Sequence, residues 1–350
     1  MEKLTPNETS PRQKYSIGFI FLVVGAFVAV MAWTLPRGVI KYEDNLVIRN
    51  FLIEKTNFLR LKLGDRVFPR ALVSRDGWME FTGDGNLNDY QNSLPFDNGK
   101  NLAKRLKAFD EYLRSQGITL LIVVAPNKAT IYPDKLPKEI TKVSEESRLE
   151  QFETFLQENN LPAALNLAPA LKQARKERDV YYRTNTHWNG YGAYVAYVEI
   201  INALSASHPE LKPYALEDLN LKTTNPTVQD IPELLRANYI KEENFFYTPK
   251  EDLVHTITLL DYFGYNRVSS VEDDSLPTLL MIHDSFGYKF LNDYLAMNFR
   301  ESHFIHGNTD TPAYLYRDII SQFDPDIIVI QIVERGLNRL ENYFSSFDAP

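Results

Sequence analysis

The stretch ITLLIVVAP, residues 118–126, is almost entirely apolar and rich in β-branched residues. Such a run is typical of a strand that is buried on both faces of a parallel sheet. Apolar residues recur at helical spacing shortly before it, at Leu102, Leu106, Phe109 and Leu113. A helix that leads into a buried strand indicates an α/β fold.

The same alternation of helix and strand continues along the chain. The predicted elements are helices over 144–157 (SEESRLEQFETFLQ), 190–206 (GYGAYVAYVEIINALSA) and 312–323 (PAYLYRDIISQF), a strand turning into a helix over 163–175 (AALNLAPALKQAR), and buried strands within 276–287 (LPTLLMIHDSFG) and 325–336 (PDIIVIQIVERG). Asn189 is placed to cap one helix, and Thr311 with Pro312 to begin another.

Residues 71–350 are predicted to form one domain. It begins with a hairpin over 73–85 (VSRDGWMEFTGDG), because an Asp-Gly turn lies between residues that favour strands. The segment 207–275 is polar and rich in turn formers, and it interrupts the α/β rhythm. We interpret it as an insertion with a few strands rather than as a second core.

One segment near the N-terminus predicts a membrane anchor. Residues 17–36 (IGFIFLVVGAFVAVMAWTLP) carry no charge over about the length that crosses a hydrocarbon core as a helix. Basic residues precede this segment, and Trp33 lies where an interfacial aromatic is common. We therefore expect a cytoplasmic tail over 1–16, a transmembrane signal-anchor over 17–36, and a juxtamembrane segment over 37–70.

The juxtamembrane segment contains a predicted helix within RNFLIEKTNFLRLKLGDRVF, residues 49–68. All that follows the anchor is expected to lie outside the cytoplasm, at the cell membrane. The alternative is a cleaved signal peptide, with Val30 and Ala32 as the small residues before a cut at Trp33.

The composition excludes several classes of function. The chain has 350 residues, of which 44% are hydrophobic and 24% charged, as in a globular protein. Its 46 acidic residues outnumber 38 basic ones and no basic block stands out, so we do not expect a nucleic-acid partner. The chain has no cysteine, which excludes disulfides, thiolate nucleophiles and zinc–sulfur sites.

Polar side chains follow three of the predicted buried strands. Asn127 and Lys128 follow the first, Ser285 the second, and Glu334 and Arg335 the third. Because the carboxyl ends of parallel strands open on the same crevice, these residues are expected to meet at a ligand site.

Ser285 and His187 are the candidates for nucleophile and base. Ser285, with Gly287 two residues on, begins a predicted helix, where free N–H groups can stabilise an oxyanion, although serine there is also a common helix cap. His187 lies in YYRTNTHWNGYG (181–192), in a loop directly before a helix. His283 is the rival base, since an alternating strand gives it the same face as Ser285. Metal ligation is a further alternative, but no paired-ligand spacing appears.

Other residues near these strand ends have two interpretations each. The amide of Asn127 could point at an oxyanion beside the Ser285 and Gly287 backbone, or Asn127 could simply form a turn. Arg335 and Glu334 could be an ion pair or could contact sugar. Trp188 could stack on sugar or pack its loop, and packing is the interpretation that we prefer.

The segments VVAPNKATIYPDKLP (123–137), YYRTNTHWNGYGAY (181–194), LLMIHDSFG (279–287) and IIVIQIVERGL (327–337) occur in that order. Together with RDGWMEF (75–81), they resemble the SGNH-hydrolase-like domain of the alginate O-acetylation proteins of the AlgJ and AlgX type. The resemblance covers roughly residues 60–345. It implies a three-layer α/β sandwich with a mostly parallel sheet, located outside the cytoplasm.

The resemblance also implies a Ser-His-Asp triad that moves acetyl groups onto an exopolysaccharide. Ser285 matches the nucleophile and His187 the base, while Asn185 stands where the family has aspartate. Lys128, Asn127, Gly287, Trp188, Arg335 and Glu334 are the candidate oxyanion or substrate-binding residues. The chain ends at Pro350, without room for the carbohydrate-binding module of one branch, so the AlgJ branch is expected.

The expected function is that of a membrane-anchored O-acetyltransferase or acetylesterase acting on a polysaccharide outside the cytoplasm. A membrane-bound acyltransferase is the expected acetyl donor, and no cofactor or metal is expected. One alternative is a glycan-binding or scaffold protein of an export complex, in which the altered triad has lost its chemistry. A lipase-like or peptidase-like hydrolase is the other.

Overall fold

The computed structural model describes residues 18, 21–26, 28–29, 49–74, 76–97, 101–250, 256–259, 266–307, 320–344 and 347. The chain divides into two compact units, Met1–Asp65 and Arg66–Pro350. In the first unit, the predicted juxtamembrane helix is present as α2 (Arg49–Lys62). Most of the predicted transmembrane segment lies outside the described residues. Within the described part, no helix is long and apolar enough to cross a membrane.

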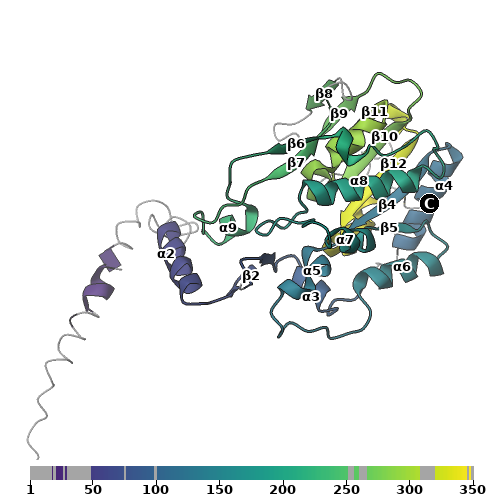
Figure 1. The fold of residues 1–350 in the computed structure, drawn as a ribbon. Coiled ribbons are helices and arrows are strands. Elements are labelled where there is room, and N and C mark those ends of the chain that lie inside the picture. Colours follow the sequence, from purple (N-terminus) through teal and green to yellow (C-terminus); the bar gives the residue numbers. More distant parts are fainter. Residues whose placement is uncertain are drawn as a thin grey trace, which may run out of the picture. The chain divides into compact units, whose positions relative to one another are not determined.

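The second unit is built on a seven-stranded sheet (Figure 1). Its strand order is β5 (Ala164–Asn166), β4 (Thr119–Ala125), β12 (Ile327–Val333), β10 (Thr278–His283), β11 (Glu301–His306), β9 (Arg267–Ser270) and β8 (Thr256–Leu259). The first five strands run parallel, whereas β9 and β8 are antiparallel additions at one edge. The predicted α/β class with a mostly parallel sheet is thus confirmed.

Helices cover both faces of this sheet. Along β4, Val123 belongs to one apolar core and Val124 to the other, as the two-residue period of a strand requires. The first core includes α7 (Ala168–Ala174), α8 (Gly190–Leu204) and α10 (Asn292–Leu295), and the second includes α4 (Leu102–Ser115), α6 (Arg148–Glu158) and α12 (Leu340–Tyr343). The result is a three-layer sandwich with the buried strands at its centre.

Short elements surround the end of the sheet where the strands finish. The predicted hairpin is part of a small antiparallel sheet of β1 (Val67–Phe68), β2 (Ala71–Val73) and β3 (Met79–Phe81). The short helices are α3 (Asn86–Tyr90), α5 (Lys128–Ile131), the π-helical turn η4 (Gly287–Leu291) and the 3₁₀ helices η2 (Pro133–Lys135) and η6 (Glu334–Arg339). The 3₁₀ helix η5 (Ala296–Asn298) lies instead just before β11, where the parallel strands begin. The predicted helix start at Thr311 and Pro312 lies outside the described residues.

The segment 207–275 contains strands, as expected, but part of it continues the main sheet. It contributes η3 (Leu216–Asp218), α9 (Asp230–Leu234), and a separate ribbon of β6 (Asn220–Thr223) and β7 (Phe245–Thr248). It also contributes β9, which pairs with β11, and β8, which pairs with β9, and both extend the sheet. The pattern of continuously apolar, buried strands did not predict this antiparallel edge. The side chains of residues 257–259 in β8 are exposed, and β9 carries the polar residues Arg267, Ser269 and Ser270.

Candidate active site

Ser285 lies just beyond β10, in a turn held by its neighbours. The Asp284 carboxylate accepts hydrogen bonds from the backbone N–H groups of Phe286 (2.9 Å) and Val333 (2.6 Å). The Gly287 N–H donates to Gln331 Oε1 at 2.9 Å. A Cβ atom at position 287 would lie 2.4 Å from the Cβ of His283, so only glycine fits this tight turn. These contacts fix where the Ser285 hydroxyl stands.

The loop that carries His187 is fixed at both ends. Tyr181 and Trp188 form an antiparallel bridge across it. Asn189 caps α8, as predicted, because its side-chain oxygen accepts from the backbone N–H groups of Tyr191 and Gly192, each at 3.0 Å. The loop therefore enters α8 in a defined direction.

The Trp188 side chain supports this loop from within the core. It is fully buried, its Nε1–H donates to the Lys289 carbonyl at 2.9 Å, and its ring packs edge-on against Phe286 at 4.9 Å. The His187 ring lies 4.9 Å from the same Phe286 ring. This position agrees with the packing interpretation of Trp188.

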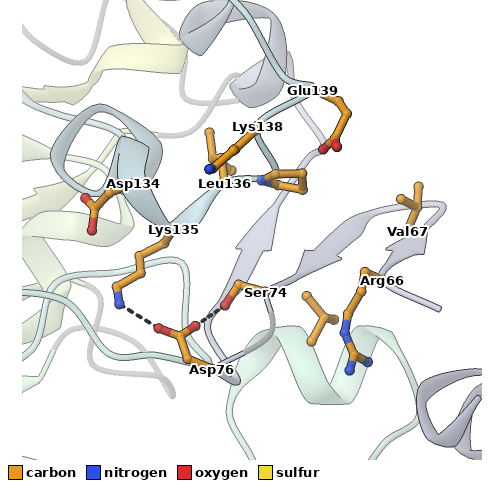
Figure 2. A pocket seen from close by; sticks show the side chains of 11 residues that line it. Arg66, Val67, Ser74, Asp76, Asp134, Lys135, Leu136, Lys138 and Glu139 are labelled. Atoms are coloured by element: carbon orange, nitrogen blue, oxygen red, sulfur yellow. Dashed lines mark hydrogen bonds and ion pairs between the residues drawn. The ribbon is translucent and has the colours of Figure 1, made fainter. Parts of the chain in front are cut away.

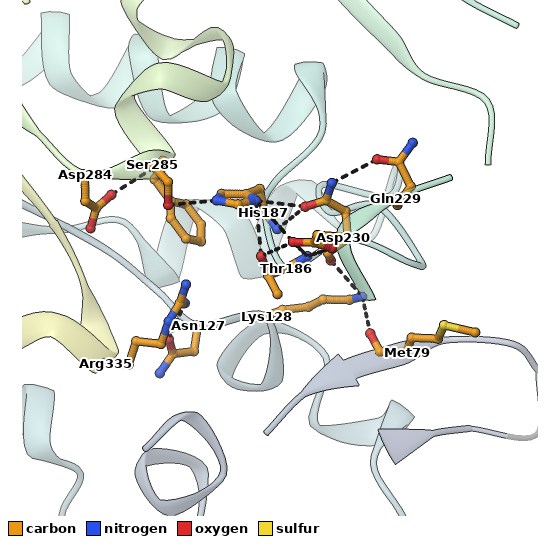
Figure 3. A network of polar contacts seen from close by, with 12 residues as sticks. Met79, Asn127, Lys128, Thr186, His187, Gln229, Asp230, Asp284, Ser285 and Arg335 are labelled. Atoms are coloured by element: carbon orange, nitrogen blue, oxygen red, sulfur yellow. Dashed lines mark hydrogen bonds and ion pairs between the residues drawn. The ribbon is translucent and has the colours of Figure 1, made fainter. Parts of the chain in front are cut away.

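A continuous chain of hydrogen bonds joins the three residues predicted as a triad (Figure 3). His187 Nε2 lies 2.8 Å from Ser285 Oγ, and His187 Nδ1 lies 2.8 Å from Asn185 Oδ1. Since the amide oxygen can only accept, Nδ1 carries the proton and Nε2 is left to accept the hydroxyl proton of Ser285. This tautomer is the one that a general base requires.

The orientation of the Asn185 amide is fixed by a second amide. Its Nδ2 donates to Gln229 Oε1 at 2.9 Å, while Gln229 Nε2 donates to Thr227 Oγ1 at 3.0 Å and to Asn244 Oδ1 at 2.8 Å. A flipped Asn185 would turn its NH₂ group toward the Nδ1–H of His187 and would lose the bond to Gln229. The surrounding network therefore selects the orientation that supports a catalytic histidine.

The environment of His187 favours the neutral imidazole. Burial lowers its pKa well below the ordinary histidine value, and the cationic side chains of Arg335 and Lys289 lower it further. His187 is therefore uncharged near neutral pH and able to accept a proton.

Arg335 and Glu334 both contact Asn127, but through different groups of that residue. Arg335 Nη1 donates to Asn127 Oδ1 at 3.2 Å, and its guanidinium carbon lies 5.6 Å from the centre of the Phe286 ring. The Glu334 carboxylate is buried and accepts from the Asn127 N–H at 2.8 Å and the Thr130 hydroxyl at 2.7 Å. Among the described ion pairs, none joins Arg335 to Glu334.

The side-chain amide of Asn127 and the backbone N–H of Gly287, which were expected to stabilise an oxyanion beside Ser285, already have hydrogen-bond partners. The Asn127 Nδ2 donates to Asp89 Oδ2 at 3.0 Å, and Asn127 is fully buried. As described above, the Gly287 N–H is taken by Gln331. The guanidinium of Arg335, by contrast, lies on the Ser285 side of His187, as Figure 3 shows, and its hydrogen bond to Asn127 positions it there.

The sequence predicts that Lys128 faces the crevice, but its side chain is buried and points to backbone carbonyl groups instead. Its buried ammonium donates to the carbonyl oxygens of Met79 (2.6 Å), Arg183 (2.8 Å) and Asn185 (3.2 Å). All three ammonium protons are thus used, and Lys128 ties the Asn185 backbone to β3. Its role in this geometry is to hold the loop.

The described hydrogen bonds of His283 go to residues other than Ser285. Its ring is fully buried, with Nε2 3.0 Å from Asn292 Nδ2 and Nδ1 2.8 Å from the Asp284 carbonyl oxygen. Metal ligation also lacks support in the described part of the chain, where no cluster of three or more histidine or acidic side chains could hold an ion.

A cleft of about 420 Å³ opens beside the Asn185–His187 pair. Its lining includes Asn185, His187, Gln229, Asp230, Phe246 and Lys289. Another cavity, of about 700 Å³, lies between the hairpin and the 134–139 segment, and the Lys135–Asp76 ion pair (2.6 Å) stands at its wall (Figure 2). Since His187 and Asn185 line the 420 Å³ cleft and neither lines the larger cavity, the 420 Å³ cleft is the candidate substrate site.

Three residues of the site escaped the sequence analysis as functional candidates. Thr186 directly precedes His187 in the sequence, while Gln229 and Asp230 lie in the segment 207–275, which the sequence predicts to be a polar insertion. Thr186 and Asp230 contact each other through both the backbone and the hydroxyl of Thr186. No motif marks Gln229 or Asp230, because a local sequence pattern does not show which distant loop a polar segment meets.

The chain is similar to proteins of polysaccharide O-acetylation. Residues 71–270 match the family model described as "SGNH hydrolase-like domain, acetyltransferase AlgX". The chain is 25% identical over 214 residues to the probable alginate O-acetylase AlgJ of Pseudomonas putida, which covers 55% of this chain and 53% of that protein. It is 27% identical over 172 residues to the same-named protein of Pseudomonas syringae pv. tomato, covering 48% and 42%. The chain thus spans about half the length of the curated relatives it matches.

Two solved structures share the fold. The O-acetyltransferase domain of Pseudomonas putida AlgJ aligns with a TM-score of 0.53 and 21% identity, covering 80% of this chain and 96% of that domain. Bacillus cereus PatB1 with a sulfonyl adduct aligns with a TM-score of 0.55 and 17% identity, covering 76% and 97%. At these identities the similarity establishes the fold.

Proposed function

The chain belongs to the family of SGNH hydrolase-like domains described for the acetyltransferase AlgX, and from this we propose that it transfers acetyl groups to hydroxyls of a polysaccharide outside the cytoplasm. The observation that carries the proposal is the unbroken hydrogen-bond chain from Ser285 through His187 to Asn185 at the ends of the parallel strands. The names of the curated relatives, probable alginate O-acetylases, support a polysaccharide acceptor.

In the first half of the reaction, Ser285 takes the acetyl group. As Ser285 Oγ attacks the carbonyl carbon of an acetyl ester, His187 Nε2 accepts the hydroxyl proton across the 2.8 Å hydrogen bond. The tetrahedral intermediate collapses when the bond to the donor oxygen breaks, and His187 returns the proton to that leaving oxygen. The product is an acetyl ester on Ser285.

In the second half, an acceptor hydroxyl in the cleft gives its proton to His187 Nε2 and attacks the acetyl carbon. The bond to Ser285 Oγ breaks, and the proton passes from His187 back to Ser285. Water as the acceptor would give hydrolysis by the same steps. A polysaccharide hydroxyl held in the cleft beside His187 and Asn185 gives transfer.

The oxyanion of each tetrahedral intermediate needs donors on the Ser285 side of the ring. We assign the Arg335 guanidinium, positioned by its bond to Asn127, and the Ser285 backbone N–H to this role. This departs from the expectation for the Gly287 N–H, which already has a partner in Gln331.

Transfer is tested with an aryl acetate donor and a deacetylated polysaccharide acceptor. With both present, the full-length chain is expected to place acetyl esters on the polymer at the expense of free acetate, because a bound hydroxyl competes with water for the acetyl-enzyme. The products are measured by NMR of the polymer and by acetate assay. Free acetate alone, unchanged by any acceptor, would favour an acetylesterase, and no acetate at all would favour a glycan-binding protein.

We also propose that the protein stays in the membrane with its second unit outside the cytoplasm, and that a membrane-bound acyltransferase supplies the acetyl group. The support is the uncharged segment 17–36 of the sequence. Full-length protein is expected to fractionate with membranes and to resist washing with salt and alkali. A soluble product that begins near Trp33 would contradict the anchor and indicate a cleaved signal peptide.

A further inference from the structure

A carboxylate lies close to the position where the triad lacks one. Asp230, the first residue of α9, places its Oδ2 3.7 Å from His187 Nδ1. The backbone N–H of Thr186 donates to both Asp230 oxygens at 3.1 Å, and the Thr186 hydroxyl donates to Oδ2 at 2.5 Å. Three hydrogen bonds from one residue thus hold this carboxylate beside the imidazole (Figure 3).

The direction of these hydrogen bonds links Asp230 to the ring. Because the Thr186 hydroxyl gives its proton to Asp230, its oxygen lone pairs are left to accept. That oxygen lies 3.1 Å from His187 Nδ1. The Nδ1–H is therefore shared between the amide oxygen of Asn185, at 2.8 Å, and the hydroxyl oxygen of Thr186.

We propose that Thr186 and Asp230 together supply the negative charge that an aspartate at position 185 would supply in a Ser-His-Asp triad. Asn185 orients the imidazole, and Asp230, acting through the Thr186 hydroxyl, stabilises the imidazolium that forms as Ser285 loses its proton. Thr186 and Asp230 are then positioning residues of the site. The predicted effect on the reaction rate rests on the proposed acetyl transfer.

The charged groups around the ring are two cations and this carboxylate. Burial lowers the pKa of His187, and the charges of Arg335 and Lys289 lower it further. Asp230 opposes both cations from the Nδ1 side. Its own pKa is raised by burial, while the Thr186 hydrogen bonds and the Lys128 ammonium favour its charged form.

Two further carboxylates lie near this region and do not reach the ring. Glu242 accepts from the backbone N–H and hydroxyl of Thr184, at 2.8 and 2.6 Å. Glu233 lies on the rim of the same cleft and is exposed. Among the described ion pairs, Asp230 is the carboxylate that lies within 4 Å of His187.

The first test is the pH–rate profile of kcat/KM with an aryl acetate. In Asp230→Asn, the plateau rate is expected to fall by at least about tenfold, short of the roughly ten-thousandfold cost of removing the triad carboxylate of a serine protease. The acid limb, where protonation of His187 stops catalysis, is expected to move to lower pH, because loss of a negative neighbour lowers the pKa of His187. A purely structural role for Asp230 would not move this limb.

Three further variants test whether the effect depends on the hydrogen bonds that connect His187, Thr186 and Asp230, or on a nonspecific loss of structure. Thr186→Val removes the hydroxyl at nearly constant shape and is expected to behave like Asp230→Asn, whereas Thr186→Ser keeps the hydroxyl and is expected to retain most of the rate. Glu243→Gln is the matched control, since Glu243 is an exposed acid of the same segment. It is expected to leave both the rate and the acid limb unchanged.

The second test does not depend on turnover. The pKa of His187 is followed by NMR in Ser285→Ala protein, and adding Asp230→Asn is expected to lower that pKa.

A third test is a kinetic rescue. Adding Asn185→Asp to the Asp230→Asn enzyme is expected to move the acid limb back to higher pH and to restore part of the rate. The restoration is partial because the Gln229 oxygen that now faces the Asn185 amide would repel a carboxylate.

The outcomes distinguish this inference from the proposed function. If Asp230→Asn leaves the acid limb and the His187 pKa unmoved while Ser285 is still acetylated, the role of Asp230 is refuted and acetyl transfer stands. If the wild-type protein forms no acetyl-enzyme, the proposed function fails, while the NMR titration still reports whether Asp230 charges the site.

Discussion

Replacing Ser285 with alanine is expected to lower the rate of acetate release from an aryl acetate by at least about a thousandfold. The hydroxyl is the only group that His187 Nε2 contacts at hydrogen-bond distance among the described interactions, at 2.8 Å. Without it, no acetyl-enzyme can form on this side chain, and only slow attack by water remains. The rate is measured by release of the chromogenic phenol from full-length protein.

His187→Ala is expected to cause a loss of similar size, and the double variant to be little worse than either single one. The two side chains act as one unit, so removing the second changes nothing once the first is gone. Ser275→Ala is a suitable control, because Ser275 is exposed and contacts Asp273. If Ser285→Ala retains most of the activity, the nucleophile assignment is refuted.

Lys128→Met is expected to lower the free energy of unfolding by about 3–5 kcal/mol. The methionine keeps the length and volume of the stem but leaves three carbonyl oxygens, those of Met79, Arg183 and Asn185, without their charged donor. Each buried group that loses its partner costs about 1–3 kcal/mol. The loss is measured by chemical denaturation, followed by the fluorescence of the buried Trp78 and Trp188.

The control for this substitution is Lys138→Met, at an exposed lysine near the same helical turns. It is expected to leave the free energy of unfolding within about 0.5 kcal/mol of wild type. The sequence analysis had placed Lys128 at the substrate or the oxyanion. If Lys128→Met lowers activity without lowering stability, that earlier prediction is correct and the anchoring role described here is wrong.

The sequence predicted the sheet and the site's location for a physical reason. Strands buried on both faces must be continuously apolar, so 118–126, 276–287 and 325–336 were recognisable without any tertiary information. Parallel strands end on the same side, which brought Ser285 and Arg335 to one crevice. The helix cap at Asn189 was equally local and equally readable.

The sequence did not reveal which polar groups are already paired. Gly287 and Asn127 look available for an oxyanion when only the strand ends are known, but Gln331 and Asp89 occupy their N–H groups in the fold. The sequence also did not reveal that Asp230 lies near His187. It lies 43 residues after His187 in the chain, and only the folding of the segment 207–275 brings it within 3.7 Å.

The most direct measurement is the mass of the protein and its peptides shortly after mixing full-length chain with an aryl acetate. Our account predicts a transient adduct of one acetyl group, located on the peptide that contains Ser285, and lost when a polysaccharide acceptor is added. The Ser285→Ala protein is predicted to carry no such adduct. Acetate release with no adduct on Ser285, or with the acetyl group on another residue, would contradict the account.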